Sequence, residues 1–408
     1  MGDRFAQQGE AQLKAVLKAK ERGVSITPVW NKSYREHKTV NTSPPELRAE
    51  ADAAVKALDW TGPYRVDADH ITMDTVDAFI ETSDFFTLDV AGYIGKPAPE
   101  HIMEEFVERR RSYVGNISIP GISGEFSVTE QTLRDIAGKF LLAAIEAGNL
   151  YSHISKAKGE DNFIAEVSMD EVKDPQTPVE LFFILSALAD YKVKAQTIAP
   201  KFSGRFNKGV DYVGDLQQFE KEFEEDILVI RHAIKEFGLP DNLKLSVHSG
   251  SDKFSIYQPI NRLIKKHDAG IHLKTAGTTW LEEIIGLSEA GNEAIELVKE
   301  IYSSALGRFD ELCGPYAAVI DADPSRLPSA EEVNSWSAEK LANTIRHDQQ
   351  HPDFNPDVRQ LLHVAYKVAG ENGDRYYAAL AKYSDIVGVH VTGNLYERHI
   401  VPLFLGRE

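Results

Sequence analysis

The sequence contains a single cysteine, Cys313, among its 408 residues, and this scarcity excludes several classes of protein. One thiol supports neither a disulfide framework nor a cysteine-rich zinc or iron–sulfur site. No apolar signal-peptide core follows Met1, and no run approaches the roughly 18 consecutive apolar residues that a membrane helix requires. We therefore expect a cytoplasmic protein that does not span a membrane.

Basic residues are also fewer than acidic ones. The chain has 63 acidic and 45 basic residues, a formal net charge of −18, and no basic patch of the kind that binds nucleic acid. Acidic runs such as residues 220–227 are typical of solvated helix faces. The charge argues against a nucleic-acid partner, and nothing in the sequence fixes the oligomeric state.

The phosphate-binding signatures G-x-G-x-x-G and G-x-x-x-x-G-K-[ST] are both missing, which argues against a nucleotide-binding fold. Instead, short apolar runs alternate with amphipathic helical segments. Many of the runs are continuously apolar, as in strands that are buried on both faces. The predicted strands are 24–30, 64–71, 85–94, 163–169, 192–199, 243–249, 269–275 and 386–392.

Eight strands that alternate with helices favour a TIM-like (β/α)8 barrel, with residues 1–408 forming one domain. Two long, largely helical insertions interrupt the pattern at about 95–160 and 279–385. Two helices have recognisable ends. One begins at Ser127, with Glu130 in the capping box, and closes at Gly148, and another runs from Asp215 to a terminating Gly238.

Ionisable residues collect where the predicted strands end, which is the edge where such barrels place their active sites. His70, His248 and His272 are the candidate ligands of a divalent metal ion such as Zn²⁺, Mn²⁺ or Ni²⁺. No H-E-x-x-H motif is present, so this prediction depends on topology.

Two carboxylates on strands that are not neighbours, Asp69 and Glu166, are the candidate catalytic acid and base. Groups placed on opposite sides of a substrate carbon suit the inversion of its configuration. Asp69 has an alternative role, which is to orient a histidine ligand. Asp67 shares its face of the strand and is a second candidate for either role.

Cations surround this predicted centre and indicate an anionic substrate. The candidate substrate-binding residues are Lys201, Lys253, Lys274, Asp252 and Asn394, and Arg205 and Lys208 lie in the same loop as Lys201. The turns that follow the sixth and seventh strands are rich in Gly, Ser and Thr. Their backbone N–H groups suit hydroxyls and carboxylates.

Five segments together resemble the tagaturonate epimerase family of bacterial hexuronate catabolism. They are VDADHI at 66–71, SDFFTLDVAGYIG at 83–95, VHSGSDKFSIY at 247–257, HLKTAGTTWLE at 272–282 and ERHIVPLFL at 397–405. The resemblance extends from about residue 60 to the end of the sequence. It implies a TIM-like barrel and a metal-dependent isomerase that interconverts the sugar acids tagaturonate and fructuronate.

The carbon inverted in such a reaction is β to the ketone, so its hydrogen is not acidic. Retro-aldol cleavage and re-addition is therefore the favoured route, with a metal ion polarising the ketone. A metal-dependent aldolase, or a ketose isomerase or epimerase acting on a related sugar, is the alternative. A sugar-acid-binding protein without catalysis is a further reading, which the carboxylates and histidines at the strand ends disfavour.

Overall fold

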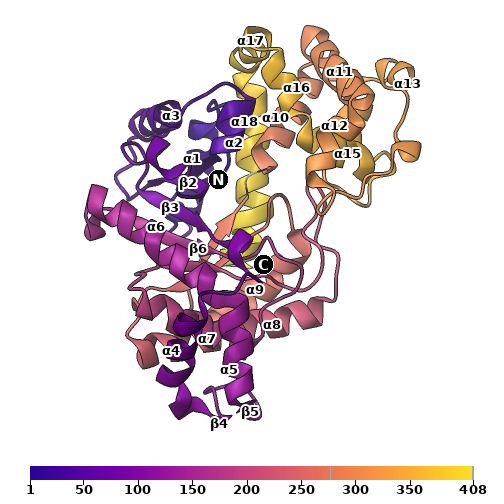
Figure 1. The fold of residues 1–408 in the computed structure, drawn as a ribbon. Helices are drawn as coiled ribbons and strands as arrows, with labels where there is room; N and C mark the ends of the chain where they lie inside the picture. Colours follow the sequence, from indigo (N-terminus) through magenta and orange to yellow (C-terminus); the bar gives the residue numbers. More distant parts are fainter. Residues whose placement is uncertain (276, 407–408) are drawn as a thin grey trace.

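The computed structural model describes residues 1–275 and 277–406, and a curled parallel sheet lies at its centre (Figure 1). Within these residues the sheet has seven strands, and neighbours in space follow one another in the chain apart from an inserted hairpin. The strands are β1 Val29–Ser33, β2 Arg65–Ile71, β3 Phe85–Asp89, β6 Ile164–Ser168, β7 Thr197–Ala199, β8 Lys244–His248 and β9 Ile271–Lys274. The hairpin pairs β4 Gly115–Ile117 with β5 Phe126–Val128.

The two faces of this sheet differ sharply in polarity. Successive side chains of a strand point to opposite faces. Val66, Phe86 and Val247 therefore lie on the outer face, buried in hydrophobic cores. The inner face is polar, and the parallel register aligns its residues in pairs: Thr87 with Glu166, Glu166 with Thr197, Ser246 with His272, and His248 with Lys274. The inside of the curl is thus an ionic centre, unlike the apolar layers that fill many barrels.

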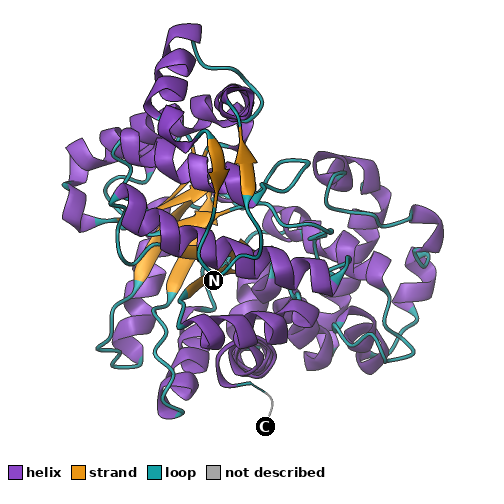
Figure 2. Cartoon of the chain, turned by 90° about the horizontal axis from the view of Figure 1, so that it is seen from below, coloured by secondary structure: helices purple, strands orange, loops and turns teal. Residues whose placement is uncertain are grey.

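Helices cover the outer face of the sheet (Figure 2). Their bounds are α1 Gly9–Glu21, α2 Tyr34–Thr39, α3 Pro44–Ala57, α4 Glu100–Arg109, α5 Glu130–Ile136, α6 Leu142–Lys158, α7 Pro178–Asp190, α8 Leu216–Phe237 and α9 Phe254–His267. The predicted ends of α8 are confirmed, since Asp215 caps its first turn and Gly238 adopts the left-handed conformation after its last.

The predicted ends of the helix at 127–148 are wrong. Thr129, whose side chain accepts a hydrogen bond from the backbone N–H of Thr132, caps α5 in place of Ser127. Gly148 lies inside α6, where the absence of a side chain lets Tyr191 approach closely. It is therefore a packing residue and not a helix terminator.

The second predicted insertion forms a helical unit around a second hydrophobic core, to which α1 also contributes residues. Its helices are α10 Thr278–Ala290, α11 Asn292–Gly307, α12 Phe309–Cys313, α13 Ala330–Asn334, α14 Ala338–Ile345, α15 Pro356–Val364, α16 Tyr366–Glu371 and α17 Asp374–Lys382. None of the helices in the described residues has the length and apolar character to cross a membrane. The assignment of all 408 residues to one domain stays a prediction.

The eighth strand, predicted at 386–392, is wrong. These residues belong to helix α18, Ser384–Gly393, which continues as a π-helix over Asn394–Leu405. The rod that the two form runs from the helical unit back to α9 (Figure 1). In the described residues β1 and β9 are therefore the edges of the sheet, and no closed eight-stranded barrel forms.

Candidate active site

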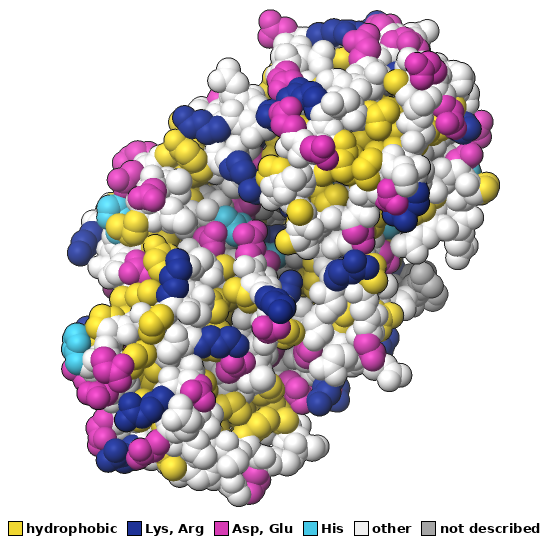
Figure 3. All heavy atoms as spheres, turned by 45° about the vertical axis from the view of Figure 1, so that its right-hand side comes forward, with side chains coloured by type: hydrophobic (Ala, Val, Ile, Leu, Met, Phe, Trp, Pro, Cys, Tyr) yellow, Lys and Arg dark blue, Asp and Glu magenta, His cyan; other side chains and the backbone are white. Residues whose placement is uncertain are grey.

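Three side chains that suit a metal ion meet at the carboxyl end of the sheet. His70 comes from β2 and His248 from β8, while Asp170 lies two residues after β6 and accepts a hydrogen bond of 2.8 Å from Ser168. One ligand atom from each of His70, Asp170 and His248 lies within 4.8 Å of the others. The surface view shows histidine and acidic side chains gathered near the middle of one face, where the surface is hollowed (Figure 3).

A strand irregularity brings His70 into this cluster. Neighbouring residues of a regular strand point to opposite faces, so His70 would be expected to point away from Asp69. The pairing of β2 with β3 shifts its register between Ala68 and Ile71, and His70 has a left-handed backbone with φ of 51°. Such a bulge re-aims a side chain, at a conformational cost that is tolerated mainly at functional sites.

Each histidine of the cluster is held by a carboxylate on one ring nitrogen. Asp69 Oδ1 lies 2.8 Å from His70 Nδ1, and Glu166 Oε1 lies 2.8 Å from His248 Nε2. The other nitrogen of His248, Nδ1, lies 3.1 Å from Asp170. Burial opposes a charge on His248, but Asp170 and Glu166 outweigh it and raise its pKa to about 10.

Lys274 connects the carboxylates of the inner face. Its ammonium lies 2.8 Å from Asp67, 2.7 Å from Asp69 and 3.2 Å from Glu166. Burial opposes this charge, yet the three carboxylates hold the pKa of Lys274 well above its usual value. Against the effect of burial, Lys274 in turn keeps the pKa values of Asp69 and Glu166 well below theirs. Its side chain is only 5% exposed, and its ammonium contacts carboxylates of the inner face. A substrate contact by Lys274 stays a prediction.

His272, the third predicted metal ligand, lies outside the cluster of ligand atoms found in the described residues. It shares the inner face with Lys274 but sits two residues earlier on β9, deeper in the curl. Its ring stacks on Phe85, with centroids 5.0 Å apart. Burial lowers the pKa of His272 to about 3, which is typical of a neutral, packed imidazole.

Two of the predicted substrate-binding residues are fully buried in a network. Asp252 accepts hydrogen bonds of 2.7 Å from Arg359 and 3.0 Å from Thr278, both in the helical unit. The ammonium of Lys253 donates to the hydroxyl of Ser251 at 2.9 Å. The contacts of Asp252 join the loop after β8 to the helical unit, and neither Asp252 nor Lys253 faces solvent.

Asn394 is also buried and donates a hydrogen bond of 2.9 Å to Glu282. Lys201 follows β7 at the edge where the ligand cluster lies, and its backbone N–H donates to Gln176 at 2.7 Å. His390, which lies in the segment predicted as the eighth strand, sits on α18 and contacts Glu289 at 2.8 Å. A substrate contact by Lys201 stays a prediction.

Two carboxylates of the centre, Asp170 and Asp89, are not among the predicted site residues. Asp170 lies two residues after β6. A search for ionisable residues at strand ends would include it if the search also covered the two positions that follow each strand. Asp89 ends β3, is partly exposed and forms no ion pair within the described part of the chain. Burial raises its pKa, Glu171 acts in the same direction, and His70 opposes them.

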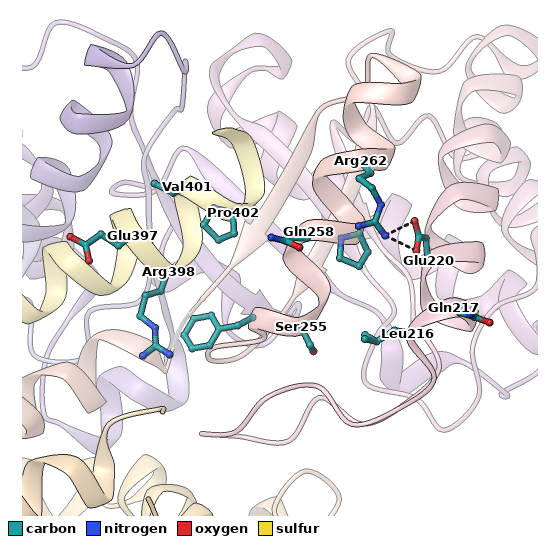
Figure 4. Close-up of a pocket in the computed structure, with 12 residues that line it drawn as sticks. Leu216, Gln217, Glu220, Ser255, Gln258, Arg262, Glu397, Arg398, Val401 and Pro402 are labelled. Carbon is teal, nitrogen blue, oxygen red and sulfur yellow. Dashed lines mark hydrogen bonds and ion pairs between the residues drawn. The ribbon is translucent and has the colours of Figure 1, made fainter. Parts of the chain in front are cut away.

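The cavity shown in Figure 4 is separate from this centre. It has a volume of about 540 Å³ and lies where α8, α9 and the π-helix meet. Phe254, Arg262 and Arg398 are among the residues that line it, and Arg262 is paired there with Glu220 at 2.9 Å. None of its twelve lining residues is a predicted site residue.

A parallel α/β sheet with paired imidazoles and carboxylates at its carboxyl edge defines an enzyme of the barrel-like class, whose chemistry lies at the strand ends. The sequence model of the tagaturonate epimerase family matches residues 1–384, and the chain belongs to this family. The protein is therefore an isomerase, a carbohydrate epimerase of the tagaturonate epimerase type. The resemblance noted in the sequence is confirmed.

Individual relatives agree with this assignment. A tagaturonate/fructuronate epimerase from Thermotoga maritima is 29% identical over 410 residues, which cover 94% of this chain and 78% of that protein. The glycerol-complexed crystal structure of the fructuronate-tagaturonate epimerase from Cohnella laeviribosi superposes with a TM-score of 0.79 at 24% identity and covers 98% of this chain and 80% of that one. Its native crystal structure gives a TM-score of 0.77, also at 24% identity and with the same coverage of both chains. At this identity the structural likeness shows the fold.

We predict that the substitution Lys274→Met lowers the free energy of unfolding by about 3–5 kcal/mol at neutral pH, because it leaves three buried carboxylates without their cation. Without Lys274 the pKa values of these carboxylates rise above their unfolded values, so the loss of stability grows as the pH rises from 5 to 8. Urea unfolding at both pH values measures the effect.

Lys194→Met is the matched control, because Lys194 is a surface lysine paired with Glu160 at 2.6 Å and its removal should leave the stability nearly unchanged. An equal loss of stability for Lys274→Met at pH 5 and pH 8 would contradict the electrostatic explanation.

Proposed function

We propose that this protein interconverts D-tagaturonate and D-fructuronate in the cytoplasm, with a divalent metal ion held by His70, Asp170 and His248. Membership of the tagaturonate epimerase family and the name of the Thermotoga maritima relative support the substrate pair. The observation that carries the metal is the convergence of two imidazoles and a carboxylate at the carboxyl end of the sheet.

The donor atoms fit such an ion. Asp69 occupies Nδ1 of His70 and Glu166 occupies Nε2 of His248, which leaves the opposite ring nitrogens for a metal. Nδ1 of His248 is buried and has no hydrogen bond of good geometry. Two nitrogens and a carboxylate oxygen accept Zn²⁺, Mn²⁺ or Ni²⁺, and an ion bound there acts as a Lewis acid on the ketone of the substrate.

The reaction itself requires one proton to leave and return. We propose that the hydroxyl on the inverted carbon gives up its proton, after which the bond between this carbon and the α-carbon breaks. The products of this step are an aldehyde and an enediolate. The aldehyde fragment rotates, the carbon–carbon bond re-forms on the other face, and the proton returns to the new alkoxide.

Asp89 is the carboxylate that best suits this proton transfer. It is partly exposed at the end of β3, forms no ion pair in the described residues, and has its pKa raised by burial above the usual value of an aspartate. Asp69 and Glu166, the predicted acid and base, are occupied by Lys274 and the two imidazoles. Their contacts favour a role in orienting His70 and His248. An acid–base role for Asp69 or Glu166 stays a prediction.

We predict that chelator-treated protein has no epimerase activity and that a single added divalent ion restores the conversion of tagaturonate to fructuronate, followed by NMR. The variant His248→Ala should hold less metal by elemental analysis and lose activity by about a hundredfold or more, since even partners of ligands affect metal sites by ~10–100-fold. His390→Ala, on α18, is the control and should behave as wild type.

If no ion restores conversion although the protein binds metal tightly, the proposed reaction is wrong. The alternative, a metal-dependent aldolase or ketose isomerase, then predicts cleavage to three-carbon products or formation of an aldose.

The roles of the carboxylates are separable by comparing metal content with turnover. We predict that Asp89→Asn keeps its metal and loses about 10²–10⁴-fold in kcat, because a proton acceptor is removed. Asp69→Asn should instead weaken metal binding by about 10–100-fold in equilibrium dialysis, because His70 loses its orienting partner. Full metal binding by Asp69→Asn together with a comparable loss of kcat would favour the acid–base role predicted for Asp69.

Retro-aldol cleavage makes a prediction about hydrogen exchange. The hydrogen on the inverted carbon stays attached throughout, so turnover in D₂O should give product without deuterium at that position. NMR or mass spectrometry of the product measures this. Incorporation of deuterium at that carbon in step with turnover would indicate deprotonation or dehydration instead.

A further inference from the structure

Two cations from separate segments of the chain lie against one tyrosine ring at the carboxyl edge of the curled sheet. Lys208 belongs to the loop after β7, and its ammonium lies 5.0 Å from the centre of the Tyr316 ring. Arg35 lies at the start of α2, just after β1, and its guanidinium lies 5.1 Å from the centre of the same ring. Tyr316 and Tyr366 both belong to the helical unit, and their hydroxyls lie 3.4 Å apart.

Neither cation forms an ion pair with a carboxylate in the described residues, although the chain has 63 acidic residues for its 45 basic ones. Other cations nearby are paired: Arg4 contacts Glu36 at 3.0 Å and Arg205 contacts Asp321 at 3.1 Å. Arg35 disfavours the positive charge of Lys208, and an anion bound by both cations would relieve this repulsion.

Lys208 is partly exposed to solvent and strongly desolvated at its ammonium. Burial lowers its pKa to about 8, and Arg4 and Arg35 act in the same direction, while Glu36 and Glu171 oppose them. A partly accessible cation in such surroundings gains more from an anionic ligand than a fully hydrated lysine does.

The segments that carry the pair lie at the edge of the sheet where the candidate metal ligands lie. The backbone N–H of Lys208 donates to Val319 at 2.8 Å, which ties the β7 loop to the helical unit. Arg35 lies two residues after Ser33, the residue of β1 whose register partner is Asp69. Glu171 directly follows Asp170 and is close enough to both cations to favour their charged forms. The two cations therefore follow β1 and β7, two strands of the sheet that are not neighbours.

We propose that Lys208 and Arg35, held against Tyr316, bind the carboxylate of the substrate and so select sugar acids over neutral sugars. The inference rests on the proposed function and names the group that recognises its substrate. In a ketohexuronate the carboxylate and the ketone lie toward opposite ends of the carbon chain. A cation pair set apart from His70, Asp170 and His248 fits that separation. The guanidinium offers paired donors to a carboxylate, and the ammonium adds a point charge.

The test compares D-tagaturonate with D-tagatose, which carries a neutral hydroxymethyl group in place of the carboxylate. Lys208→Met and Arg35→Gln in the metal-loaded enzyme should each raise KM for tagaturonate about ten- to a hundredfold, as expected for a lost contact to a charged group. The constant for tagatose, measured as a substrate or as a competitive inhibitor, should stay within about twofold, since no carboxylate is involved.

Arg205→Gln is the matched control, because Arg205 lies in the loop that carries Lys208 and is already paired with Asp321. It should leave KM for tagaturonate unchanged. An unchanged KM for tagaturonate in both Lys208→Met and Arg35→Gln overturns the inference. A rise of equal size for both sugars also overturns it, because it indicates a structural effect.

Titration calorimetry with D-tagaturonate distinguishes a failure of this inference from a failure of the proposed function. If wild type binds tagaturonate more tightly than both variants but does not convert it, the proposed function is wrong and the carboxylate site is supported. If wild type converts tagaturonate and all three proteins bind it with equal affinity, the proposed function is supported and the carboxylate site is wrong. Absence of binding by wild type removes both.

Discussion

The arrangement of the inner face depends on one buried ammonium. Lys274 pairs with Asp67, Asp69 and Glu166, which the curled parallel sheet could not otherwise hold together at 0–10% side-chain exposure. The desolvation penalty of such a cluster is large, and the mutual attraction offsets it only when the geometry is good. The main contribution of the cluster is therefore to position side chains, and its contribution to stability is smaller. Asp69 and Glu166 each hold a histidine, and Asp67 is linked to Glu166 through Thr87.

The surrounding structure keeps this polar centre in place from two sides. Apolar side chains on the outer face of the sheet pack against helices, so hydrophobic burial helps to set strand order and register. The helical unit holds the loops at the carboxyl edge, where Arg359 binds Asp252 after β8 and Lys208 is tied to Val319. Loops that carry functional groups are thus anchored to a second core, and their freedom to move is small.

The strands and most of the candidate site could be predicted from the sequence, because both depend on local pattern. Continuous apolar runs identify strands that are buried on their outer face, and the polar residues that end these runs are His70, His248 and their carboxylates. Asp170 was not predicted, because it lies beyond the apolar run of β6. His272 lies outside the cluster of ligand atoms in the described residues, because it precedes Lys274 by two positions on the same face of β9, and sequence alone does not tell which of these two levels reaches the centre. Its role as a metal ligand stays a prediction.

Other features depend on contacts between residues far apart in the chain, which no local pattern encodes. Asp252 and Lys253 follow a strand as substrate-binding residues do, but Arg359, which occupies Asp252, lies 107 positions away. Residues 386–392 are rich in β-branched residues and alternate as a strand does. Val387 and Val391 nevertheless bury the i and i+4 positions of a helix, while Val389 is 71% exposed. Tertiary packing there overrides the intrinsic preference for a strand.

The charge of the centre explains why the same residues suit both a metal ion and the fold. Asp69 and Glu166 each accept from one ring nitrogen, and Asp170 lies against His248, so the carboxylates favour positive charge at both imidazoles. Lys274 alone does not balance four carboxylates when Asp67 and Asp170 are counted with Asp69 and Glu166. The proposed divalent cation between His70, Asp170 and His248 would meet this demand with the same charge as two imidazolium protons. Its binding would then exchange protons for an ion without altering the electrostatic balance on which the inner face depends.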